Sequence, residues 1–170
     1  RRALTPPGAP ESGVGLPRDA RLPPRRGELR AVDRQSWAAF VAIVGLVPPD
    51  RREVREVVPG WSLKDLFWHN VGWALFSAEE LAKLDGGPFV DPFEGHDDET
   101  VDRENAEQLE RGRALTWDAM LTQAEAMRAR ARELWAGLGE LTPEAADWFA
   151  EETSVHYEEH GEEIDRFLEA

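Results

Sequence analysis

Three histidines have the spacing expected of a metal site. His156 and His160 lie one helical turn apart, so a helix over this stretch presents both imidazoles on one face. The other positions on that face are apolar or small: Phe149, Thr153, Ile164 and Phe167. His69 has a similar setting earlier in the chain, on a predicted helical face that it shares with Leu66, Trp73 and Phe76. Core positions normally hold hydrocarbon side chains, so imidazoles aimed into a core need a polar partner.

A divalent metal is one such partner. Two imidazoles at positions i and i+4 can bind one ion, and a third leaves coordination positions open for water or substrate, as in catalytic zinc sites. The alternative is that each imidazole is an ordinary hydrogen-bonded core residue, because short motifs give many false matches. The chain has no cysteine, so any metal has nitrogen and oxygen ligands, and a cysteine nucleophile is excluded.

Acidic and aromatic residues near the histidines are candidates for the remaining roles. Glu152 precedes His156 by one turn, and we select it as the catalytic acid or base. The other acids that can orient an imidazole are Glu163, Asp65 and Glu80. Glu151, Glu158, Glu159 and Glu162 fit a solvated face. Trp61 and Trp73 are the candidate cofactor-binding residues, in an aromatic pocket that Trp68 and Phe93 can also line.

Composition limits the class of protein. With 170 residues and 41% hydrophobic content, the chain suits one globular domain with a core. A formal charge of -14 argues against nucleic acid or an anionic membrane as the partner, since both need a basic surface. No apolar run is long enough for a membrane span, and no leader peptide is recognisable. We therefore expect a cytoplasmic protein that acts on a small molecule; a homodimer stays open.

The apolar spacing predicts an all-α, antiparallel four-helix bundle over residues 27–170, with helices at 27–44, 62–85, 104–138 and 143–168. Ser62 and Thr142 are the predicted N-caps of the second and fourth helices. Gly72 is expected to let a neighbouring helix approach closely. Residues 1–26 are rich in proline and arginine and predict an extended arm.

Residues 88–103 predict a long loop that covers or borders the histidine site. Its length is unusual for a compact helical domain, and long loops are often functional. Phe89 and Phe93 would otherwise be exposed there, whereas His96 is most simply a solvated loop residue. We therefore interpret the loop as a lid.

Two stretches resemble the DinB-like superfamily over about residues 29–168. Residues 59–66, PGWSLKDL, followed by His69, look like its helix-two signature, and residues 156–160, HYEEH, resemble its last-helix motif. The superfamily includes YfiT-type metal-dependent hydrolases, mycothiol-dependent maleylpyruvate isomerases and bacillithiol transferases. The resemblance implies a four-helix bundle with zinc or nickel on a triad, here His69, His156 and His160. The isomerases have Glu at the position of His156, so this chain is more similar to the all-histidine YfiT type.

The resemblance leads to two hypotheses of function. The first is a metal-dependent enzyme that activates a low-molecular-weight thiol for S-transfer to a small electrophile, with metal-dependent hydrolysis as the close alternative. Mycothiol is the favoured thiol because the arginine-rich, lysine-poor usage is typical of a high-GC genome. The second hypothesis is a non-catalytic protein that sequesters a reactive small molecule and confers self-resistance.

Overall fold

The regular elements in the described part of this protein are helical. The computed structural model describes residues 26–84, 87–95 and 98–170; most of the predicted arm, and also His96, lie outside them. Within that part of the chain the only β-type pairing is an isolated bridge between Val58 and Trp61, so the all-α expectation is confirmed. None of the described helices is long and apolar enough to cross a bilayer.

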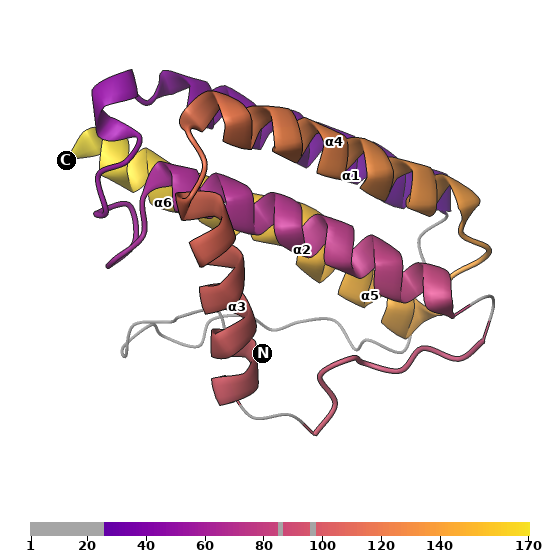
Figure 1. The fold of residues 1–170 in the computed structure, drawn as a ribbon. Coiled ribbons are helices and arrows are strands. Elements are labelled where there is room, and N and C mark those ends of the chain that lie inside the picture. The colour runs from indigo at the N-terminus through magenta and orange to yellow at the C-terminus, as the bar shows by residue number, and fades with distance from the viewer. Residues whose placement is uncertain (1–25, 85–86, 96–97) are drawn as a thin grey trace, which may run out of the picture.

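Figure 1 shows the arrangement of the helices. In chain order they are α1 (Arg26–Leu46), α2 (Leu63–Lys83), α3 (Asp98–Arg113), α4 (Trp117–Gly137), α5 (Pro143–Ala150) and α6 (His156–Glu169), with a 3-10 turn η2 (Pro49–Arg51) and a π-helical turn η3 (Glu151–Val155). Both predicted N-caps are confirmed. Ser62 accepts from the Asp65 backbone N–H, and Thr142 accepts from Ala145. The start of α2 is therefore fixed within its own sequence.

The predicted third helix, 104–138, is two helices. α3 begins at Asp98, inside the predicted loop, and α4 begins after its N-cap, Thr116. The indole N–H of Trp68 in α2 donates to the Gln108 carbonyl at 2.9 Å. A Cβ on Gly112 would meet the Trp68 ring at 2.6 Å, so α3 lies directly against α2. Gly72 faces the Gln108 side chain, as expected of a close approach. Contacts with α2 thus hold a helix whose own sequence is strongly polar.

Helices α2 and α4 pack side by side and run in the same direction (Figure 1). Lys64, at the start of α2, donates to the Leu115 carbonyl just before α4, at 3.0 Å. Leu81 and Leu134, near the other ends of these helices, line one cavity. The expectation that all neighbouring helices are antiparallel is therefore wrong. The reason is that α3 and its flanking segments return the chain to the starting end of α2 before α4 begins.

A buried ion pair joins three helices inside the core. Asp33 of α1 and Arg128 of α4 are each 2% exposed, and their two N–O distances are both 3.2 Å. Arg128 also donates to the Tyr157 hydroxyl of α6 at 2.8 Å, and its guanidinium lies 4.5 Å from the centre of the Trp37 ring. Burial raises the pKa of the Tyr157 phenol far above its ordinary value, so this hydroxyl stays protonated. These contacts fix α6 against α1 and α4.

Candidate metal centre

The three predicted histidines meet between α2 and α6. One ring nitrogen from each of His69, His156 and His160 lies within 4.8 Å of the others. The Nε2 atoms of His69 and His156 are 2.9 Å apart. His69 is only 5% exposed, and the other two are partly buried. The predicted convergence of the three imidazoles is confirmed.

A π-helical turn precedes the two histidines of α6. The predicted helix 143–168 is interrupted at η3, where Thr153 donates its hydroxyl to the Phe149 carbonyl at 2.6 Å and Ser154 donates to Ala150 at 3.4 Å. Such bonds to preceding carbonyls loosen the regular helical ladder. The turn changes the helical register, so a single wheel from Phe149 to His156 does not describe the face. Single π-turns of this kind are frequent at functional sites.

Burial keeps two of the imidazoles neutral. Desolvation lowers the pKa of His69 well below its ordinary value, and the neighbouring His156 and His160 lower it further. Desolvation also lowers the pKa of His156 well below its usual range, with a further contribution from His160. A neutral imidazole has a free lone pair, which is the form that binds a metal. The low pKa values therefore favour metal binding near neutral pH.

A carboxylate orients the third imidazole. Glu163 Oε2 lies 2.6 Å from His160 Nδ1 and can accept a hydrogen bond from the Nδ1–H, which leaves the lone pair on Nε2. Glu163 was one of several acids that the sequence placed near the site. Glu152, the acid selected from the sequence, is buried in η3 at 7% exposure. Its role as a proton acceptor stays a prediction.

The donor atoms fit a divalent ion. Bonds of about 2.0–2.1 Å in a tetrahedral site separate two nitrogens by about 3.3 Å. The separations here, from 2.9 Å to at most 4.8 Å, bracket that value, so small rotamer changes suffice. His69 Nε2 lies within hydrogen-bond distance of His156 Nε2, whereas His69 Nδ1 is a buried atom with no hydrogen-bond partner among the described residues, so hydrogen bonding accounts for only one of the two ring nitrogens. Three neutral nitrogens without a thiolate suit zinc or nickel.

Two tryptophans flank His69. The Trp61 ring stands edge-on to the imidazole with centroids 4.9 Å apart, and Trp73 does so at 6.2 Å. Trp73 is held from α3, because its indole N–H donates to Asn105 Oδ1 at 3.0 Å. Trp68, the third predicted pocket residue, instead donates to α3 through Gln108. Trp61 and Trp73 thus form the aromatic surroundings of the centre.

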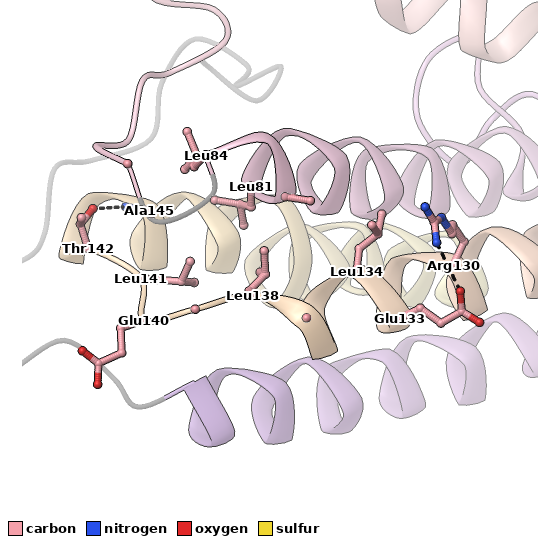
Figure 2. Close-up of a pocket in the computed structure, with 14 residues that line it drawn as sticks. Leu81, Leu84, Arg130, Glu133, Leu134, Leu138, Glu140, Leu141, Thr142 and Ala145 are labelled. Atoms are coloured by element: carbon pink, nitrogen blue, oxygen red, sulfur yellow. Dashed lines mark hydrogen bonds and ion pairs between the residues drawn. The ribbon is translucent and has the colours of Figure 1, made fainter.

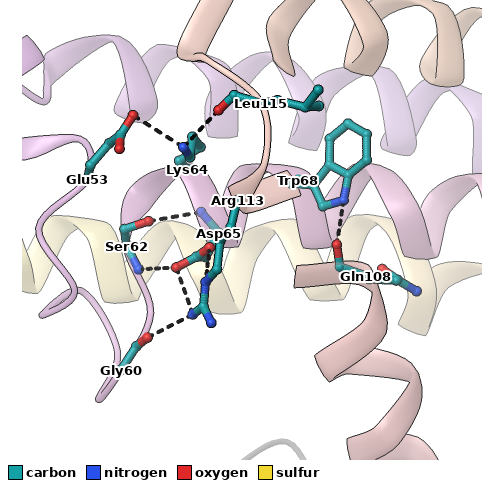
Figure 3. Close-up of polar contacts among 9 residues, drawn as sticks. All are labelled: Glu53, Gly60, Ser62, Lys64, Asp65, Trp68, Gln108, Arg113 and Leu115. Carbon is teal, nitrogen blue, oxygen red and sulfur yellow. Dashed lines mark hydrogen bonds and ion pairs between the residues drawn. The ribbon is translucent and has the colours of Figure 1, made fainter. Parts of the chain in front are cut away.

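Arg113 fixes the turn that carries Trp61 (Figure 3). It donates to both oxygens of Asp65, at 2.9 and 3.1 Å, and to the Gly60 carbonyl at 3.0 Å. Gly60 has a φ of 83°, a conformation that favours glycine. Burial by itself raises the pKa of Asp65, but the bonds from Arg113 and Ser62 outweigh it and lower the pKa. Asp65, another acid considered from the sequence, therefore stabilises the start of α2.

A separate cavity of about 500 Å³ lies at the far end of α2. Figure 2 shows it between the end of α2, the end of α4 and the start of α5, with Leu81, Leu134 and Leu138 among its lining residues. Arg130 and Glu133 form an exposed ion pair at 3.4 Å on its rim. None of the three histidines lines this cavity. We therefore place the chemistry at the histidines rather than here.

The fold and the site together define an all-α protein with a three-histidine cluster that can hold a metal ion. No family model and no curated protein matches the sequence. Among solved structures, the chain is similar to the crystal structure of an uncharacterised protein from Escherichia coli UTI89. The TM-score is 0.69 at 12% identity, and the match covers 87% of this chain and 95% of that one. At this identity the similarity shows the fold alone.

Proposed function

We propose that this protein is a metal-dependent enzyme with a DinB-like four-helix bundle, formed by α1, α2, α4 and the continuous pair α5–α6. His69, His156 and His160 hold zinc or nickel, and the enzyme promotes attack by a small thiol on an electrophilic small molecule. The observation that carries the proposal is the placement of three imidazole nitrogens within 4.8 Å of one another. The resemblance to the YfiT-type triad supports the same assignment.

Each neighbouring residue has a role in this proposal. A divalent ion at these nitrogens supplies Lewis-acid chemistry, which lowers the pKa of a thiol or of water. The neutral imidazoles leave the charge of the site positive, which favours an anionic nucleophile. Glu163 holds His160 in the tautomer with a free Nε2. Glu152 accepts the proton that the thiol, or the water, releases.

The thiol is an external co-substrate because the chain has no cysteine. The similarity to mycothiol- and bacillithiol-using enzymes favours such a thiol, with mycothiol first. The small-molecule electrophile, a cytoplasmic location and the absence of a nucleic-acid or membrane partner belong to the same proposal.

Metal analysis and a thiol assay test the proposal. The untagged protein should contain about one divalent ion per chain and should convert one or more electrophiles in the presence of mycothiol, bacillithiol or glutathione, as read by mass spectrometry. His160→Ala should lose both metal and turnover while keeping its helix content. Glu159→Ala, an exposed position of the same helix, is the control and should keep both.

The outcomes separate the alternatives. Equal turnover by wild type and His160→Ala would end the metal-centred mechanism. Turnover that needs the metal but no thiol would replace S-transfer by hydrolysis. Metal binding with tight ligand binding and no turnover would instead identify a sequestering protein.

A further inference from the structure

A phenyl ring from the loop before α3 lies in an aromatic slot on α2. Phe93 packs on Trp73 and on Phe76, with centroids 5.6 Å apart in both cases. Trp73 and Phe76 stand edge to face at 5.3 Å, so the two rings form a corner that a third ring fills. Aromatic pairs favour these tilted arrangements beyond the effect of apolar burial alone. The slot therefore suits a planar aromatic group.

The slot is one ring away from the histidines. Trp73 contacts both Phe93 and the His69 imidazole, and Asn105 fixes its indole N–H. A group in the position of Phe93 is thus linked to His69 through the single ring of Trp73. This contact places Phe93, from the described part of the predicted loop, against one of the two tryptophans that flank His69.

The side chain that fills the slot comes from a surface turn. Asp91 orders this turn, because its side chain accepts from the Phe93 backbone N–H at 2.9 Å and its carbonyl accepts from Glu94 at 3.0 Å. The neighbouring Val90 is 61% exposed, and Phe93 itself is only partly buried. A ligand ring that replaces Phe93 keeps the contacts with Trp73 and Phe76, so the cost of the exchange is limited to the contacts and burial that Phe93 itself gives up.

We propose that Trp73 and Phe76 form an aryl subsite and that the ligand carries a phenyl or similar planar ring, which takes the place of Phe93. This inference rests on the proposed function, since it names the substrate class of the same centre. The ring binds in the slot while the reacting group extends past Trp73 towards His69. Phe93 acts as an internal competitor for the subsite.

The slot itself is tested without metal. Phe93→Ala should bind 4-fluorotoluene in 19F NMR titrations and should be stabilised by it in thermal unfolding, more than by methylcyclohexane. The expected preference is about three- to tenfold, the worth of about one aromatic pair. Val90→Ala, on the same loop, should behave like wild type. If Phe93→Ala loses helix content, Phe93→Leu replaces it. Equal binding of both hydrocarbons, or no binding of either, would overturn the inference.

The link to the metal is tested with zinc-loaded protein. Benzohydroxamate should bind about three- to tenfold more tightly than cyclohexanehydroxamate, and Trp73→Leu should remove that preference. Phe93→Ala should increase the affinity for benzohydroxamate. Zinc uptake with equal binding of the two hydroxamates would refute the aryl subsite but not the metal centre. Failure to take up zinc, with the 4-fluorotoluene result intact, would refute the metal centre but not the slot.

Discussion

Replacing Glu163 with glutamine should weaken metal binding without removing a ligand. The carboxylate accepts from His160 Nδ1 at 2.6 Å, so it both fixes the tautomer and places a negative charge behind the imidazole. Glutamine keeps the size and a hydrogen-bond acceptor but removes the charge. The change therefore isolates the electrostatic part of the contact.

The expected loss of zinc affinity follows from the distance between the Glu163 carboxylate and the metal. Adding about 2 Å across the ring and about 2.1 Å for the nitrogen–metal bond places the carboxylate roughly 6.5 Å from the ion. At that distance a single negative charge and a doubly positive ion attract by about 1.3 kcal/mol in water and about 2.5 kcal/mol at half its dielectric constant. The side chains of His160 and Glu163 are 16% and 24% exposed, so solvent reaches the pair and screens part of the attraction. Zinc should bind about 10- to 70-fold more weakly to Glu163→Gln.

Competition with a chelator of known zinc affinity measures this loss. Glu162→Gln is the matched control, because it removes the same charge from the adjacent, exposed position. Screening by water and salt should keep its effect within about twofold. Equal weakening in the two variants would mean that only the net charge matters, and unchanged binding in Glu163→Gln would mean that the Glu163 carboxylate does not act on the metal through His160. Either result refutes the reasoning.

Three further predictions concern stability and rate. Asp33→Ala should lower the free energy of unfolding in urea by about 3–5 kcal/mol, because it leaves Arg128 buried without its carboxylate partner. The double variant Asp33→Leu with Arg128→Met should lose much less stability. Equal losses in the two variants would contradict this account. The lowered pKa of Asp65 should stabilise the fold at all pH values above its ordinary 3.8 and lose that effect as the pH falls through the lower folded value. Asp65→Asn should flatten this acid-side decline in urea titrations, and an unchanged slope would exclude Asp65 as its cause. Glu152→Gln should keep the metal content and lose turnover, whereas loss of metal would assign Glu152 a supporting role in metal binding.

The sequence predicted the features that depend on local chemistry. Ser62 and Thr142 are N-caps because hydroxyl oxygens can accept from the free N–H groups of a first helical turn. The helical period placed His156 and His160 together and aimed His69 into the core. These residues act over one or two turns, a range over which a single sequence is informative.

Features that depend on distant contacts were not predicted. α3 has almost no apolar stripe, and its position against α2 depends on contacts such as that between Trp68 and Gln108. The π-turn η3 was not predicted, because a helical wheel assumes a constant rotation per residue. The Asp33–Arg128 pair was also missed, although a charge at the i+4 position from Leu29 on an apolar face was a usable signal.

The chain distance between the metal-site helices has a consequence for folding. His69 and His156 are 87 residues apart in sequence, and they meet only once α6 has docked beside α2. Contacts of such long range form late, because closing a large loop costs entropy before the contact can repay it. A partly folded chain therefore offers at most the local His156–His160 pair, a weak bidentate site. The appearance of tight zinc binding during refolding should report the final docking step of the domain.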